Sequence, residues 1–224
     1  MAEGTDPGTN ATRALEQLAR ALRPLAEEPP RPSGLRAAGV LALIDARRPD
    51  LPLLLERRSH RLRSHPGQVG LPGGSAAELD GALWRTALRE AEEELAIPPT
   101  AVRPLGYLDP VIITHSGFLM VPTVAEVVHD FTPRAEPQEV AGWFWLPLLQ
   151  AGSLVRDVLR ERRTSRGTLL VPGYVQGRDF VWGAAREVVD RLRRGLGERF
   201  PDPAPIRERD PDRPSPVVGP GGER

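Results

Sequence analysis

Two residue types and one kind of segment are missing from this chain of 224 residues, and each absence excludes a class of chemistry. There is no cysteine, so disulfides, thiol nucleophiles and thiolate metal sites are excluded. There is no lysine either, because all 30 basic residues are arginine, and this excludes Schiff-base catalysis by a lysine amine. No apolar run approaches the roughly 20 residues that cross a bilayer as a helix.

Charge of one sign is not in excess either. The 30 acidic and 30 basic residues give a formal net charge of zero, so no global field attracts nucleic acid or a membrane surface. The N-terminal sequence MAEGTDPGTN is polar and lacks the apolar segment of a secretory signal. We therefore expect a cytoplasmic protein with no nucleic-acid or membrane partner.

Composition and periodicity divide the chain into three parts. Leucines at helical spacing, followed by the segment EEPPRPSG, predict an N-terminal helix and linker over residues 1–34. Residues 35–199 predict one α/β domain of mixed strands, with helices over 82–97 and 183–196. Residues 200–224 are rich in proline and poor in apolar residues, which predicts a disordered tail. The strands predicted in the central part are 37–45, 51–57, 102–109, 117–128, 138–147, 167–174 and 178–182.

The helix predicted over 82–97 carries three carboxylates on the side opposite its apolar stripe. Glu90, Glu93 and Glu94 are spaced at i, i+3 and i+4, where like charges repel each other. A hard divalent cation would remove that repulsion, because it prefers oxygen ligands. A Glu-rich helix face is more often simply solvated, so the helix alone leaves both interpretations open.

The segment before this helix is rich in glycine and proline. Residues 65–80 read HPGQVGLPGGSAAELD. Consecutive glycines let the backbone come close to a ligand, and a carbonyl in such a turn can add an oxygen ligand to a cation held by the helix. In isolation the segment could equally be an ordinary turn. The specific feature is that this loop adjoins the three glutamates.

Residues 73–97, GGSAAELDGALWRTALREAEEELAI, resemble a Nudix box. The core of that box runs Gly, five residues, Glu, seven residues and then REUxEExGU, where U is aliphatic. Two positions depart from it. Asp80 stands where the box has Glu, with one extra residue before Arg89, and Ala96 stands at a helix-cap position where the box has Gly. The positions that match the helical half are Arg89, Glu90, Ala91, Glu93, Glu94 and Ile97.

The segment upstream, LLERRSHRLRSHPGQVGLPGG over 54–74, resembles the additional signature of coenzyme A pyrophosphatases within the Nudix superfamily. Leu71 replaces the phenylalanine of that signature. With weaker similarities further on, the resemblance covers about residues 35–190. The matching positions are Leu54, Leu55, Arg58, Ser59, Arg63, Gly67, Pro72, Gly73 and Gly74.

The resemblance implies a Nudix-type α/β/α sandwich around a mixed β-sheet. It also implies Mg²⁺-dependent hydrolysis of the pyrophosphate bond of coenzyme A to 3′,5′-ADP and 4′-phosphopantetheine, with Mn²⁺ as an alternative ion. The expected metal ligands are Glu90, Glu93 and Glu94, with the backbone carbonyl near Gly74 as a further oxygen.

Other residues have expected roles around this metal site. The general base must be a carboxylate near the attacking water, and the two candidates are Glu93 and Glu139, which could also be an ordinary exposed residue. Arg58 and Arg63 are candidates for binding substrate phosphate, against the alternative of a solvated basic turn. His65 could contact phosphate too, although an isolated histidine is more often structural.

Two rival functions remain open on the sequence. A Nudix hydrolase of another substrate, such as ADP-ribose, a dinucleotide or an oxidised nucleotide, would share the three glutamates but would not explain the 54–74 signature. A non-catalytic Nudix module that binds a nucleotide or a partner would be expected to have lost the REUxEE glutamates, and here all three are present.

Overall fold

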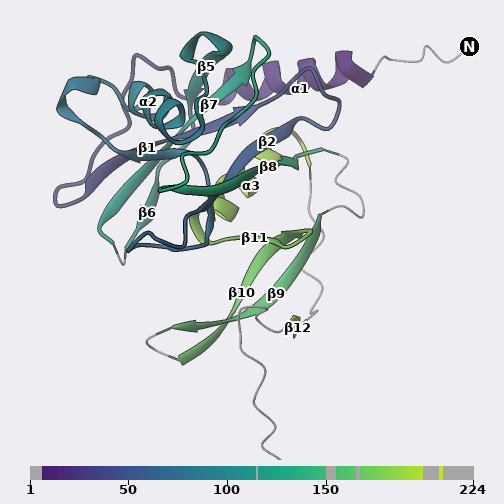
Figure 1. The fold of residues 1–224 in the computed structure, drawn as a ribbon. Coiled ribbons are helices and arrows are strands. Elements are labelled where there is room, and N and C mark those ends of the chain that lie inside the picture. The colour runs from purple at the N-terminus through teal and green to yellow at the C-terminus, as the bar shows by residue number, and fades with distance from the viewer. Residues whose placement is uncertain (1–6, 115, 150–154, 165–166, 199–206, 209–224) are drawn as a thin grey trace, which may run out of the picture.

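The computed structural model describes residues 7–114, 116–149, 155–164, 167–198 and 207–208. Within these residues the centre is an eight-stranded mixed sheet in the order β3-β2-β1-β7-β5, with β4 paired to β1, β6 to β7 and β8 to β2 (Figure 1). Its strands are β1 (Arg36–Ile44), β2 (Pro52–Arg58), β3 (Val69–Gly70), β4 (Gly73–Ser75), β5 (Val102–Tyr107), β6 (Val111–Ile113), β7 (Phe118–Val127) and β8 (Val140–Pro147). The pairing of β1 with β7 is parallel and that of β2 with β8 is antiparallel.

Helices cover both faces of this sheet. On one face α1 (Pro7–Ala21) and α3 (Gly183–Gly195) pack through residues such as Leu15 and Val188 against Ala42 and Ile44 of β1. On the other face α2 (Leu83–Leu95) packs through Ala87 and Ala91 against Leu41 and Leu43. Because side chains alternate between faces, β1 is buried on both sides and reads as a continuous apolar run. The predicted α/β/α sandwich is confirmed.

The helix α2 lies unusually close to β1. A Cβ at Gly39 would stand 2.3 Å from the carbonyl oxygen of Leu83, so only glycine permits this approach. At its other end α2 stops at Ala96, which adopts the left-handed conformation with φ 52°. Alanine tolerates that conformation at a cost of about 1 kcal/mol, which explains how the chain ends the helix without the usual glycine.

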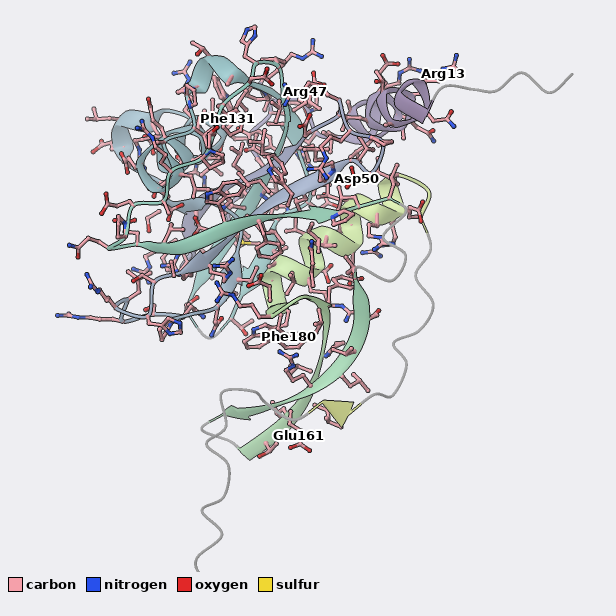
Figure 2. All side chains as sticks on the ribbon, turned by 45° about the vertical axis from the view of Figure 1, so that its right-hand side comes forward. Arg13, Arg47, Asp50, Phe131, Glu161 and Phe180 are labelled. Atoms are coloured by element: carbon pink, nitrogen blue, oxygen red, sulfur yellow. The ribbon has the colours of Figure 1, made fainter. Side chains whose placement is uncertain are left out.

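A second, four-stranded sheet extends from the main body in the order β11-β10-β9-β12 (Figure 1). Its strands are β9 (Arg156–Thr164), β10 (Gly167–Gln176), β11 (Asp179–Trp182) and the two-residue β12 (Arg207–Glu208). Phe180 lies where this sheet joins the body, under the guanidinium of Arg160 at 4.4 Å, and Glu161 lies farther out (Figure 2). The sequence predicted β10 and β11 but not β9, because β9 is charge-rich and is stabilised by its nine-residue pairing with β10.

Of the predicted C-terminal tail, the structure describes only the backbone of β12, which pairs in parallel with β9. The remainder of residues 200–224 lies outside the described residues, so the predicted disorder stays a prediction. None of the helices that the structure describes is long and apolar enough to cross a membrane.

The N-terminal segment contacts the domain that follows it. Besides the packing of α1, the predicted linker places one oxygen of Glu28 where it accepts hydrogen bonds from the Leu83 backbone N–H, at 2.9 Å, and from the Tyr107 hydroxyl, at 2.7 Å. The first N–H groups of a helix have no partner inside the helix, so Glu28 satisfies an otherwise unpaired donor of α2. The predicted domain boundary after residue 34 stays a prediction. The hydrogen bonds of Glu28 to Leu83 and Tyr107 cross this boundary.

Candidate functional site

The strand β2 projects two charged residues toward the α2 side of the sheet. Leu54 of this strand packs with the apolar face of α2, whereas Leu53 and Leu55 pack on the opposite side of the sheet. With the period of two along a strand, Glu56 and Arg58 follow Leu54 onto the α2 side. Sequence reasoning had assigned Arg58 to the site and had missed Glu56.

Glu56 is fully buried, with 0% of its surface exposed. Neither of its carboxylate oxygens accepts a hydrogen bond from any residue that the structure describes. Burial is the main cause that raises the Glu56 pKa, to about 7; the nearby charge of Arg58 opposes this, and the charges of Glu139 and Glu90 add to it. The signal in the sequence was an acidic residue at a core-facing position of an otherwise apolar strand.

Glu94 projects from α2 and is 3% exposed. One of its oxygens accepts a hydrogen bond from the backbone N–H of Gly73 at 2.8 Å, which ties the glycine loop to the helix. Burial, followed by the charge of Glu56, raises the Glu94 pKa to about 9. Both buried carboxyls are therefore held toward their neutral forms as long as no cation is bound beside them.

Glu90 lies one helical turn earlier and faces the second glycine of the loop. A Cβ on Gly74 would stand 2.5 Å from the Glu90 carboxyl carbon, so the backbone at Gly74 rests directly on this carboxylate. The pKa of Glu90 is raised by its partial burial, and the charges of Glu93 and Glu139 act in the same direction. The structure thus brings Glu90, Glu94, Gly73 and Gly74 together.

Glu93 does not join this group. It is 57% exposed and pairs with Arg89 at 3.0 Å, as the i, i+4 spacing predicts. Arg89 also binds Asp80 at 2.9 Å and Glu90 at 2.8 Å, and it holds the pKa of Asp80 well below its ordinary value. Among the residues that the structure describes, no three acidic or histidine side chains already enclose a metal position.

Two further predicted residues, Glu139 and Arg58, act on the buried carboxylates through their charges and differ in their exposure to solvent. Glu139 is exposed in the turn before β8, where its carbonyl accepts the Ser59 N–H at 2.7 Å, and its charge acts on Glu56 and Glu90. Arg58 is half-buried, and its charge acts on Glu56 and Glu94. Its Nε is buried and donates to no residue that the structure describes.

The two other predicted phosphate contacts lie in the loop after β2. Arg63 is exposed. His65 is half-buried with φ 55°, and its Nδ1 lies 3.0 Å from the Gln68 side-chain oxygen. His65 therefore has a partner inside its own loop, which supports the structural alternative for this residue.

A hard divalent cation fits the residues present. The donors are carboxylate oxygens and backbone carbonyls, which such ions prefer. The unpartnered oxygens of Glu56 and the contact between Gly74 and Glu90 show where oxygen ligands converge without competing donors. Burial first, and the charges of neighbouring carboxylates second, raise the pKa values of Glu56 and Glu94, and a cation beside them would favour their ionised forms.

The chain is similar to known proteins of one family. The NUDIX domain family matches residues 35–168. A Yersinia enterocolitica protein named "Uncharacterized Nudix hydrolase NudL" is 43% identical over 147 residues, covering 65% of this chain and 74% of that protein. A protein of the same name from Pectobacterium atrosepticum is 38% identical over 192 residues, covering 84% of this chain and 93% of the other.

Among solved structures, the MutT/nudix family protein of Enterococcus faecalis is similar with a TM-score of 0.45 at 15% identity, over 86% of this chain and 73% of that one. The family match spans more than half of the chain and includes β2, the glycine loop and α2. The protein therefore belongs to the Nudix family and is a Nudix pyrophosphohydrolase.

Proposed function

We propose that this enzyme hydrolyses the pyrophosphate bond of coenzyme A and its derivatives, giving 3′,5′-ADP and 4′-phosphopantetheine. The proposal rests on the position of the 54–74 signature, which lies beside the carboxylate cluster. The charge of its arginine Arg58 acts on Glu56 and Glu94, and its final glycines contact Glu94 and Glu90. A sequence pattern that resembles coenzyme A pyrophosphatases thus supplies one wall of the carboxylate cluster.

The residues have distinct roles in this proposal. Glu90 and Glu94, with the carbonyl near Gly74, hold a divalent cation, for which we propose Mg²⁺ with Mn²⁺ as the alternative. When bound, such an ion neutralises the diphosphate and acidifies a bound water. Glu93 would have to break its ion pair with Arg89 before it could coordinate the ion.

We assign the general base to Glu139 in preference to Glu93. A base must reach the attacking water with a free carboxylate. Glu93 is directed toward Arg89 and solvent, whereas the charge of Glu139 acts on both Glu56 and Glu90 from the turn before β8. Glu139 can therefore accept a proton beside the carboxylate cluster, at the mouth of the site.

Gly74→Ala tests the contact between the loop and the helix. The added methyl would displace the Glu90 carboxylate, which is the flexible end of its side chain, so we expect about a tenfold loss of kcat with little change in Tm. Ser75→Ala is the control, because Ser75 is exposed in the same loop and its side chain has no role in the proposed site. Equal kcat values in both variants would refute the role of Gly74 in placing Glu90.

Arg63→Ala tests recognition of the substrate. Loss of a charge-assisted contact to phosphate is worth roughly 1.5–3 kcal/mol, so kcat/KM for coenzyme A should fall about ten- to a hundredfold. Arg61→Ala is the control, because Arg61 is exposed in the same loop and is not a matching position of the signature. Arg58 is less suitable, because its removal would also leave Glu56 and Glu94 without their nearest positive charge.

Dephospho-coenzyme A separates the two phosphate groups that Arg63 could bind, because it keeps the diphosphate and lacks the 3′-phosphate. If Arg63 binds the 3′-phosphate, the variant and the native enzyme should hydrolyse this compound at similar rates. If it binds the diphosphate, the variant should lose kcat/KM equally for both substrates. Should the native enzyme hydrolyse ADP-ribose and neither coenzyme A compound, with products identified by mass, the coenzyme A proposal fails.

A further inference from the structure

The carboxylate of Glu56 has no role in the chemistry assigned so far, although it is the most deeply buried acid of the site. We propose that Glu56 is an additional ligand of the divalent cation, acting from β2 opposite Glu94 and Glu90 of α2. The inference rests on the proposed function only in requiring a cation at this cluster, and it is independent of which nucleotide is hydrolysed.

The first support is that Glu56 is both buried and without partners. A carboxyl group that is 0% exposed normally receives hydrogen bonds, because a buried polar group without them destabilises the fold. Both oxygens of Glu56 lack such partners among the described residues. By contrast, Glu94 at 3% exposure is held by the Gly73 N–H. A cation ligand needs its oxygens free in this way.

The second support is the balance of charge around Glu56. The groups that act on it are the guanidinium of Arg58 and the carboxylates of Glu90, Glu94 and Glu139. When all are ionised, four carboxylates and one guanidinium leave a net charge of about −3, and a bound divalent cation offsets most of it. A bound divalent cation would therefore balance most of the negative charge of the cluster.

The third support is the space beside Glu56. In the sheet Glu56 pairs with Gly70 of β3 on one side and with Trp143 of β8 on the other. Directly paired residues project to the same face of a sheet. Because Gly70 has no side chain and a Cβ there would meet nothing within 4 Å, open space lies next to Glu56 on the Gly70 side. A cation and its remaining waters need such a space.

Calorimetric titration of the full-length protein with Mg²⁺ alone, without nucleotide, tests the inference. We expect Glu56→Gln to weaken Mg²⁺ binding by tenfold or more and to reduce the rise in Tm that Mg²⁺ produces. Glu92→Gln is the control, because Glu92 is exposed on α2, away from the cluster, and should leave the affinity unchanged. If Glu56→Gln fails to fold, Glu56→Met replaces it, with a similar volume and no polar group.

Three results would decide the matter. Native affinity for Mg²⁺ in a folded Glu56 variant would overturn the inference and would reduce Glu56 to a buried structural acid, while the proposed hydrolysis would stand. Weakened affinity in that variant would support the inference even if coenzyme A proved not to be the substrate. Absence of Mg²⁺ binding in the native protein would overturn both the inference and the proposed metal site.

Discussion

Glu94→Gln is expected to lose most of its turnover, by roughly a hundredfold or more, while keeping its fold. Loss of one metal-binding carboxylate costs several kcal/mol of transition-state stabilisation. The fold should persist because the raised pKa of Glu94 makes this carboxyl neutral in the metal-free protein at neutral pH, and glutamine is its neutral isostere. The amide oxygen can still accept the Gly73 N–H.

Steady-state kinetics at saturating Mg²⁺, together with thermal unfolding in the presence of a chelator, would measure the two effects separately. Glu92→Gln again serves as the control, since it removes a neighbouring negative charge of α2 that lies away from the cluster and should leave kcat near the native value. A folded Glu94→Gln protein with native kcat would show that Glu94 holds no catalytic metal.

The metal-free protein should become less stable as the pH rises from about 5 to about 9. The folded-state pKa values of Glu56 and Glu94, about 7 and about 9, lie above the ordinary value of 4.5. Between these values the folded state binds more protons than the unfolded state, so the free energy of unfolding falls with pH. The stabilisation is complete below pH 4.5 and is lost as the pH rises through the folded-state values.

Glu56 and Glu94 together should contribute roughly a few kcal/mol to this decrease, because the folded-state pKa of each is raised. Urea denaturation with chelator present, repeated across this pH range, would measure it. Glu56→Gln and Glu94→Gln should each flatten the profile, because glutamine does not titrate. Added Mg²⁺ should oppose the decrease, because the ion stabilises the ionised carboxylates of the folded state. A profile that is flat in the native protein would contradict the burial of these two ionisable groups.

The sequence by itself predicted the helix α2 and the long core strands, and its motifs indicated the family. The 3.6-residue periodicity of α2 separates an apolar stripe from its glutamates, and this local pattern is enough to predict the helix. The core strands were likewise predicted from apolar runs between turn residues. The predicted helix ran to residue 97, whereas α2 ends at Leu95 with Ala96 as its left-handed cap, the position where the Nudix box has Gly.

Only the tertiary structure decided which acidic residues share one environment. Glu90, Glu93 and Glu94 look equivalent on the helix, yet packing of α2 on the sheet buries Glu94 and leaves Glu93 beside Arg89 at the surface. Glu56 enters the cluster because β2 lies in a register that turns this residue toward α2, although 38 positions separate it from Glu94 along the chain. Helical periodicity is local, whereas burial and charge depend on neighbours that only the packed sheet and helix bring together.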